Sequence, residues 1–124
     1  MLGPEKMVAF VPTRNPKKVR PFYENVLGLR FASADQFATV FDANGTMLRV
    51  TNVPELKPQP FTILGWKVSN IEEVALALQH RGVHFEIYGG MEQDKLGIWR
   101  SPSGAEVAWF KDPDGNVLSV TQFS

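Results

Sequence analysis

The sequence predicts an α+β fold in which one βαβββ module occurs twice in tandem. Three observations support this prediction. Two internal matches relate the halves of the 124-residue chain, each half carries a segment of helical period among β-rich segments, and each half has a turn signal before its last strand. A chain of this length is expected to form one domain. We therefore expect a single domain over residues 1–124, made of modules at about 5–52 and 61–122 that are joined by the proline-rich linker 53–60.

The internal repeat is defined by two matches at different offsets. Asn15 matches Asn70 at an offset of 55 residues, so the two halves begin alike. Residues 42–51 match residues 112–121 at an offset of 70 residues and share the pattern D-x-N/D-G-x-x-L-x-V-T, so the halves also end alike. The two offsets differ by 15 residues, which predicts an insertion in the second half, within residues 89–104.

In the first module, the helix is expected to begin at Asn15, because Pro16 then occupies the first helical position, where a missing N–H costs nothing. Apolar residues follow at helical spacing as far as Gly28. Pro21 lies inside this segment and is expected to kink or shorten the helix. The strands of this module are expected at residues 7–11, 30–32, 37–41 and 47–51.

In the second module, Ser69 and Glu72 form an S-x-x-E capping box that predicts the start of a helix, and Gly82 ends it. The buried stripe of this helix is expected to comprise Ile71, Val74, Ala75 and Leu78. Strands are expected at residues 61–68, 84–88, 106–110 and 117–121. Asn44-Gly45 and Asp114-Gly115 are hairpin signals, so the last two strands of each module are expected to be antiparallel.

Composition and charge exclude several classes of function. Thirteen Lys and Arg residues balance thirteen Asp and Glu residues, so the chain lacks the basic field of a nucleic-acid-binding protein and a polybasic membrane patch. No apolar run approaches the roughly 18–20 residues that a membrane span needs. The absence of cysteine excludes disulfides, thiolate zinc sites and cysteine nucleophiles. We expect a soluble, cytoplasmic protein without a signal peptide, which binds neither nucleic acid nor membrane.

Alternation of side chains divides each expected sheet into two faces. One face is apolar and is expected to lie beneath the helices: Met7, Ala9, Val11, Leu48, Val50, Leu64, Trp66, Val68, Leu118 and Val120. The opposite face is mixed: Val8, Phe10, Met47, Arg49, Thr51, Phe61, Ile63, Gly65, Lys67, Ser119 and Thr121. An apolar surface with a few polar groups is typical of a small-molecule site, and we interpret the mixed face in this way. A subunit interface and a solvent-facing sheet are the alternatives.

The repeated module resembles the vicinal oxygen chelate superfamily, which includes glyoxalases, bleomycin-resistance proteins, extradiol dioxygenases and fosfomycin-resistance enzymes. The resemblance rests on the duplicated βαβββ order, on Phe22-Tyr23 ahead of Leu27-Gly28, and on the F-x-D-P-D-G-N pattern at residues 110–116. It covers nearly the whole chain. It implies a curved mixed sheet around a cavity, with the helices on the outer face, commonly in a homodimer.

Metal-using members of that superfamily place one His or Glu ligand on the first and last strand of each module. The resemblance assigns these positions here to Val8, Arg49, Ile63 and Ser119. None of these residues is a normal ligand for a divalent metal, and an arginine would repel the ion. We therefore expect neither a metal site nor another cofactor.

The candidate ligand-binding residues come mainly from the mixed face. Arg49 is central among them, because its planar guanidinium suits a carboxylate, a phosphate or an enolate. The alternative for Arg49 is a structural ion pair with an acidic group of this chain or of a partner subunit. The full set is Phe10, Arg49, Thr51, Phe61, Ile63, Lys67, Trp99, Ser119 and Thr121.

The insertion is bounded by glycines and rich in reactive side chains, which is typical of a lid or a binding loop. The residues that it offers to a ligand are Met91, Glu92, Gln93, Asp94 and Trp99. A solvated hairpin over residues 98–102 is the alternative for this segment.

The candidate acid–base residues are His84, Glu92 and Asp94. His84 is expected to share a strand face with Glu86 and Tyr88, but a solvated strand face has the same composition, so the catalytic residues stay unassigned. Asp112 and Asp114 are expected to shape the hairpin turn, where Asp, Pro and Gly favour the required geometry. The sequence does not decide whether Trp109 or Phe110 faces the cavity.

The function that the sequence predicts is metal-independent binding of a small organic molecule, anionic or carbonyl-bearing, in the cavity, with Arg49 as its anchor. The first alternative is an enzyme of the same superfamily, a lyase, isomerase or dioxygenase-like protein that acts on a small carbonyl compound and uses Arg49 to stabilise an oxyanion. The second is a regulatory or interaction module whose cup is filled by side chains. The expected partners are the small molecule and a second copy of the chain.

Overall fold

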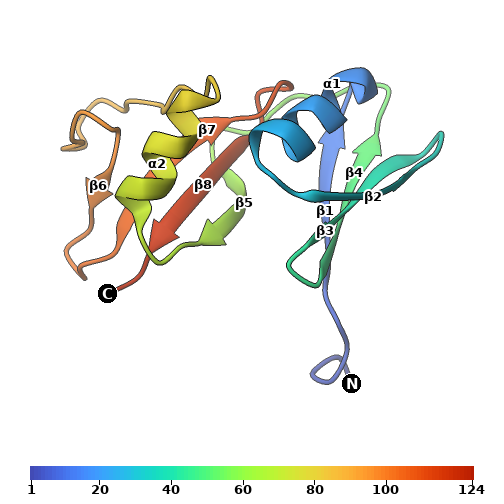
Figure 1. Cartoon of the computed structure of the whole chain (residues 1–124), viewed down its shortest axis with the longest axis horizontal. Coiled ribbons are helices and arrows are strands. Elements are labelled where there is room, and N and C mark those ends of the chain that lie inside the picture. The colour runs from blue at the N-terminus through green and yellow to red at the C-terminus, as the bar shows by residue number, and fades with distance from the viewer. The chain divides into compact units, whose positions relative to one another are not determined.

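A computed structural model describes residues 1–124, which divide into two compact units at residues 1–57 and 58–124. The first unit holds β1 (Val8–Thr13), α1 (Pro16–Arg20), the π-helix η1 (Pro21–Val26), β2 (Arg30–Ala34), β3 (Ala38–Ala43) and β4 (Thr46–Asn52). The second holds β5 (Thr62–Lys67), α2 (Ile71–His80), β6 (Trp99–Arg100), β7 (Glu106–Lys111) and β8 (Val117–Gln122). The predicted α+β fold with two tandem βαβββ modules is confirmed (Figure 1).

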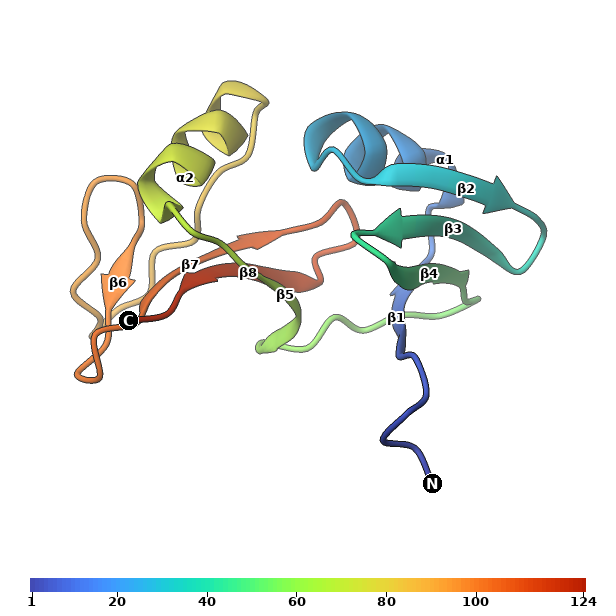
Figure 2. The same cartoon turned by 60° about the horizontal axis from the view of Figure 1, so that its bottom comes forward.

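Each unit is built on one four-stranded mixed sheet. The strand orders are β1-β4-β3-β2 and β5-β8-β7-β6, so the two units share one topology. In each sheet the first strand of the module pairs in parallel with its last strand, and the remaining pairs are antiparallel. Asn44 and Gly45 both have positive φ, as the predicted turn between β3 and β4 requires. Each helix lies over one face of its own sheet (Figure 2). Neither helix has the length and apolar character that crossing a membrane requires.

The helical segment of the first unit changes from an α-helix to a π-helix at Pro21. The regular α-helix ends one residue before it, and a π-helix follows, in which Leu27 N donates to Phe22 O at 2.9 Å, five residues earlier. Proline has no N–H to donate, and its ring crowds the preceding turn, so the four-residue hydrogen-bond spacing fails at this point. The prediction that Pro21 shortens the regular helix is confirmed. The turn directs Tyr23 into the core, where its ring lies 5.7 Å from that of Phe41.

The second helix begins one residue later than its sequence predicts. Asn70, and not Ser69, is the N-cap, and its side-chain Oδ1 accepts a hydrogen bond from Glu73 N at 3.2 Å. The prediction that Ser69 and Glu72 form a capping box is therefore wrong. The side chain of Gln122 on β8 explains the shift, because it accepts from Ile71 N at 2.9 Å and fixes the first turn from outside the helix.

The predicted strand over residues 84–88 is also wrong. Glu86 N donates to Trp109 O at 2.8 Å, and the ring of Phe85 packs 5.9 Å from that of Phe110, but the segment forms no strand. β6 occupies the edge of the sheet instead and pairs with the beginning of β7. The insertion therefore supplies the fourth strand that residues 30–34 supply in the first unit.

Most of the predicted helix-side positions are confirmed as core. Val11, Leu48, Val50, Leu118 and Val120 are buried. Ala9, Leu64, Trp66 and Val68 are half-buried. The prediction for Met7 is wrong: Met7 precedes β1 and is 78% exposed, because the strand begins only at the next residue.

Candidate functional site

The open face of the second sheet, opposite α2, carries a row of three aromatic rings. Trp109 on β7 is paired in register with Ser119 on β8, so the two side chains share this face. The ring centroid of Trp109 lies 5.6 Å from that of Tyr88 and 6.1 Å from that of Trp99. Phe110 pairs with Leu118 and is buried on the helix side. We call Tyr88, Trp109 and Trp99 the aromatic row.

Register places three more predicted ligand-binding residues on the open face of the second sheet. These residues are Lys67, Ser119 and Thr121. Lys67 pairs with Thr121, Thr121 pairs with Val107, and Val107 pairs in turn with Trp99. Ser119 is buried, and a side chain at its partner Gly65 would meet the Ser119 Oγ, since a Cβ built there lies 2.7 Å away. Ser119 is thus enclosed by the sheet itself and forms part of its wall.

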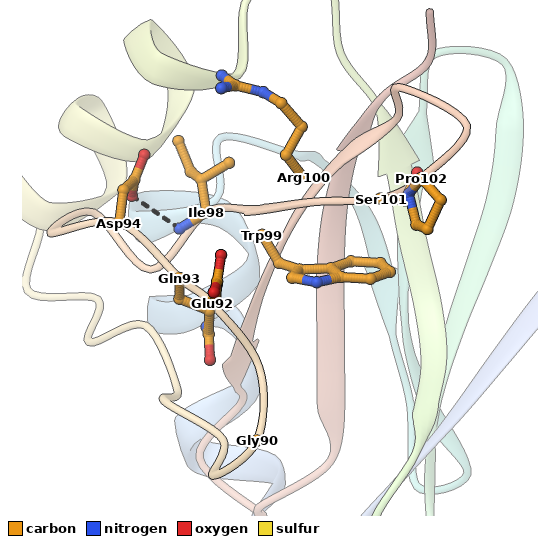
Figure 3. Close-up of a pocket in the computed structure, with 9 residues that line it drawn as sticks. All are labelled: Gly90, Glu92, Gln93, Asp94, Ile98, Trp99, Arg100, Ser101 and Pro102. Carbon is orange, nitrogen blue, oxygen red and sulfur yellow. Dashed lines mark hydrogen bonds between the residues drawn. The ribbon is translucent and has the colours of Figure 1, made fainter.

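The insertion forms a pocket beside Trp99 with a volume of about 600 Å³ (Figure 3). We call it the Trp99 pocket. Four of the five residues that the insertion was expected to offer line it, and Met91 does not. The lining residues are Gly90, Glu92, Gln93, Asp94, Ile98, Trp99, Arg100, Ser101 and Pro102.

The loop that forms the Trp99 pocket is held by Asp94 and Ile98. Asp94 Oδ1 accepts from Leu96 N at 2.9 Å and from Ile98 N at 3.0 Å, the second of which is drawn in Figure 3. Gly97 turns the chain between them at a φ of 84°. Ile98 is buried and anchors the loop against the core. The segment after it is the edge strand β6, so the pocket has a sheet strand as one wall.

The charged side chains that line the Trp99 pocket differ in whether they are already paired within the chain. Arg100 Nη2 lies 3.0 Å from Glu106 Oε2, and this hydrogen bond is the main cause that raises the pKa of Arg100, followed by the charges of Glu106, Asp94 and Glu72. The Arg100 charge is therefore already engaged. The carboxylate of Glu92 is exposed on the same pocket.

At the other end of the aromatic row, Tyr88 keeps its phenol proton. Burial is the main cause that raises the pKa of Tyr88, and the charge of Glu86 adds to it. Glu86 Oε1 lies 3.4 Å from Lys111 Nζ, so this carboxylate is itself paired. At neutral pH the row therefore ends in a hydroxyl group that can donate a hydrogen bond.

Arg49 lies on the open face of the first sheet, between Phe10 and Val40 in register. It is half-buried, and the ion pairs of the chain join other residues. Hydrogen bonds from Phe37 N and then from Ala38 N lower the pKa of Asp35 most. The charge of Arg49 contributes to this lowered pKa, but it is the last of the causes. Arg49 thus carries a positive charge without an ion pair inside the chain.

The other predicted ligand-binding residues of the first sheet, and those at and just before β5, differ in their burial. Thr51 is half-buried opposite Ala38, whereas Phe10 is exposed. Phe61 precedes β5 and is exposed, and Ile63 is half-buried at an irregularity in the pairing of β5 with β8.

The acid–base candidates do not lie together. Glu92 and Asp94 line the Trp99 pocket, whereas His84 lines a second pocket of about 380 Å³, which Gln79 and Lys95 also line. Asp94 already accepts two backbone hydrogen bonds through Oδ1. The three acid–base candidates are therefore divided between two pockets.

The sequence leaves open whether Trp109 or Phe110 faces the cavity, and the structure places Trp109 on the open face. The Asp114-Gly115 hairpin fixes the register that places Trp109 opposite Ser119, so this signal was available.

The positions that the resemblance assigns to metal ligands do not fit a metal ion. Val8, Arg49, Ile63 and Ser119 offer no imidazole, carboxylate or thiolate. Nowhere in the chain do three His, Asp or Glu side chains group in a way that could hold a metal.

Comparison with known proteins identifies the family. A model of the glyoxalase/bleomycin resistance protein/dioxygenase superfamily matches residues 7–120. No curated protein matches the chain.

Three solved structures illustrate the likeness of fold. The glyoxalase family protein from Enterococcus faecalis is 20% identical with a TM-score of 0.75, over 98% of this chain and 100% of that one. A bleomycin-binding protein complexed with bleomycin is 20% identical with a TM-score of 0.74, over 97% and 99%. Lactoylglutathione lyase from Agrobacterium tumefaciens is 15% identical with a TM-score of 0.73, over 96% and 94%. At these identities the likeness concerns the fold alone. Because the family model spans most of the sequence, the chain belongs to the glyoxalase/bleomycin resistance protein/dioxygenase superfamily.

Proposed function

We propose that the protein binds a small organic molecule, anionic or carbonyl-bearing, and does so without a metal ion. The observation that carries this proposal is the aromatic row, which ends at Trp99 on the wall of a pocket of about 600 Å³. Ligand pockets of this size hold drug-sized molecules, and aromatic side chains supply large contact areas for planar groups. A fold neighbour that was solved with bleomycin supports small-molecule binding as a use of this fold.

Arg49, in the first unit, is the residue that best suits an anionic or carbonyl-bearing ligand. The residue is half-buried, forms no ion pair inside the chain and pairs in register with Phe10. A charge in this setting gains from an anion that a hydrated surface arginine would bind only weakly. A cytoplasmic homodimer stays the predicted state of the protein. Binding is favoured over catalysis because His84 lines a different pocket from the candidate carboxylates of Glu92 and Asp94.

Replacing Arg49 by alanine is expected to weaken the binding of a small aromatic carboxylate such as benzoate to the open face of the first sheet by about 1.5–3 kcal/mol. The reason is the loss of a charge-assisted hydrogen bond to the carboxylate. Affinity is measured by titration of the wild-type protein and the variant, followed by NMR.

Arg30→Ala is the matched control in the same unit. Arg30 is exposed, and its Nη2 lies 3.7 Å from Asp42 Oδ2, so its removal is expected to leave the affinity unchanged. Equal affinities of wild type and Arg49→Ala would show that Arg49 has no part in binding.

Metal independence predicts that the purified protein contains no stoichiometric metal. Addition of manganese, nickel or zinc, or of a chelator, is expected to leave the midpoint of thermal unfolding unchanged, because only an ion bound to the folded state raises it. Elemental analysis and thermal unfolding measure both quantities. Stoichiometric metal with a midpoint that falls in the presence of chelator would contradict this part of the proposal.

A further inference from the structure

We propose that the side-chain amide of Gln93 positions Trp99 in the aromatic row, an inference that rests on the function proposed above. The amide of Gln93 makes three hydrogen bonds to backbone groups. Oε1 accepts from Tyr88 N at 2.8 Å, and Nε2 donates to Glu86 O and to Gly97 O, each at 2.9 Å. Both N–H groups of the amide are therefore used.

The Gln93 amide takes the place of a neighbouring strand. Residues 84–88 form no strand, and the N–H of Tyr88 and the C=O of Glu86 bond to this side chain instead. A side-chain amide offers the same donor and acceptor as a peptide group, so it can satisfy a free stretch of extended backbone. Gln93 thus joins residues 84–88 to the far end of the insertion loop at Gly97.

The same residue holds both ends of the aromatic row. Its side chain bonds the backbone of Tyr88, and its backbone forms an isolated antiparallel bridge with Trp99. The rings of Tyr88 and Trp99 both pack against that of Trp109. Figure 3 shows Gln93 on the loop of the Trp99 pocket that lies opposite β6. The position of Gln93 therefore sets the position of the Trp99 indole relative to the rest of the row.

Gln93→Glu tests this role, because a carboxylate has nearly the same shape but cannot donate to Glu86 O or Gly97 O. The chain contains Trp66, Trp99 and Trp109, so an NMR spectrum of the indole N–H groups has three cross-peaks, which single Trp→Phe variants assign. At neutral pH the Trp99 cross-peak is expected to move while that of Trp66 on β5 stays in place. The affinity for naphthoate is expected to fall about tenfold.

Protonation is expected to reverse the effect of Gln93→Glu. A carboxylic acid regains one donor, which Glu86 O or Gly97 O can accept, so protonation through the pKa of the new carboxyl group restores one of the two lost hydrogen bonds. As the pH falls through that pKa, the Trp99 cross-peak returns toward its wild-type position. Gln79→Glu is the matched control: Gln79 is exposed on α2, and the same change there leaves the Trp99 cross-peak in place at every pH.

Gln93→Met keeps the proposal testable if the charged variant does not fold, since it retains the length of the side chain without polar groups. It is expected to move the Trp99 cross-peak at all pH values, with no return on acidification. An unmoved Trp99 cross-peak in the folded variants would overturn the role of Gln93. A moved cross-peak with unchanged naphthoate affinity, or no naphthoate binding by the wild type, would instead contradict the aromatic row as the binding site.

Discussion

Replacing Gly97 by alanine is expected to lower the free energy of unfolding by about 3 kcal/mol. Gly97 has a φ of 84°, a conformation that costs an L-residue free energy, and a Cβ built on it lies 2.8 Å from Phe85 Cβ. Phe85 Cβ is tied to the backbone and cannot move aside as the end of a long side chain would. The phenyl ring of Phe85 packs on Phe110, so the displacement reaches the core. Urea denaturation at constant m-value measures the loss.

Gly90 supplies the control for Gly97 within the same insertion. Its φ is also 84°, but nothing lies within 4 Å of a Cβ built on it. Gly90→Ala therefore reports the conformational cost alone, which is about 1 kcal/mol. Equal losses for the two variants would show that the contact with Phe85 relaxes without cost and that the loop is not packed tightly against the core.

Replacing Asp112 by alanine is expected to destabilise the protein by about 3 kcal/mol, because it leaves buried donors without an acceptor. Asp112 is 6% exposed. Its Oδ1 accepts from Asp114 N and from Asn116 N, and its Oδ2 accepts from Asn116 Nδ2, each at 2.9 Å. The carboxylate thus organises the whole turn between β7 and β8, as its sequence position predicts. Thermal and urea unfolding measure the effect.

The repeat provides the control for Asp112. Asp42 occupies the same place in the first unit, where its Oδ1 accepts from Gly45 N at 2.8 Å and its side chain is partly exposed. Asp42→Ala is expected to cost about 1 kcal/mol, since it removes one backbone hydrogen bond whose donor can turn to water. A loss as large as that of Asp112→Ala would contradict the importance of burial at the second turn.

The sequence carries most of the fold because its signals are local and occur twice. Asn44-Gly45 specifies a turn through its own backbone preferences, and Pro21 interrupts a helix through its own ring. Such residues determine the backbone conformation of only a few neighbouring positions in the sequence. The duplicated pattern then fixes the topology, because the same elements in the same order form the same sheet.

The errors arise where a residue distant in the sequence decides the local structure. Gln122 reaches the first turn of α2 from another strand, which shifts the cap to Asn70. Residues 84–88 have the composition of a strand, but β6 occupies their expected place beside β7, and the Gln93 amide bonds their backbone groups. No pattern within either segment reports these contacts.

The candidate site is predicted in part for the same reasons. The difference between the two repeat offsets predicts where the insertion lies, and four of the residues expected to contact a ligand line the Trp99 pocket. The aromatic row was not predicted, because the distances of Tyr88 and Trp99 from Trp109 depend on how the insertion returns to the sheet. The alternation of side chains predicts that Arg49 and Phe10 lie on the mixed face of the first sheet, and the two residues pair in register.

The brevity of β6 has a consequence for association between molecules. An edge strand with many free peptide groups can template the pairing of another chain and so begin aggregation. β6 contains only Trp99 and Arg100, and Gln93 already bridges Trp99 on the side away from β7. Few peptide groups are therefore left on this edge for a foreign strand. The insertion that forms the pocket therefore leaves this edge of the second sheet a poor template for edge-to-edge aggregation.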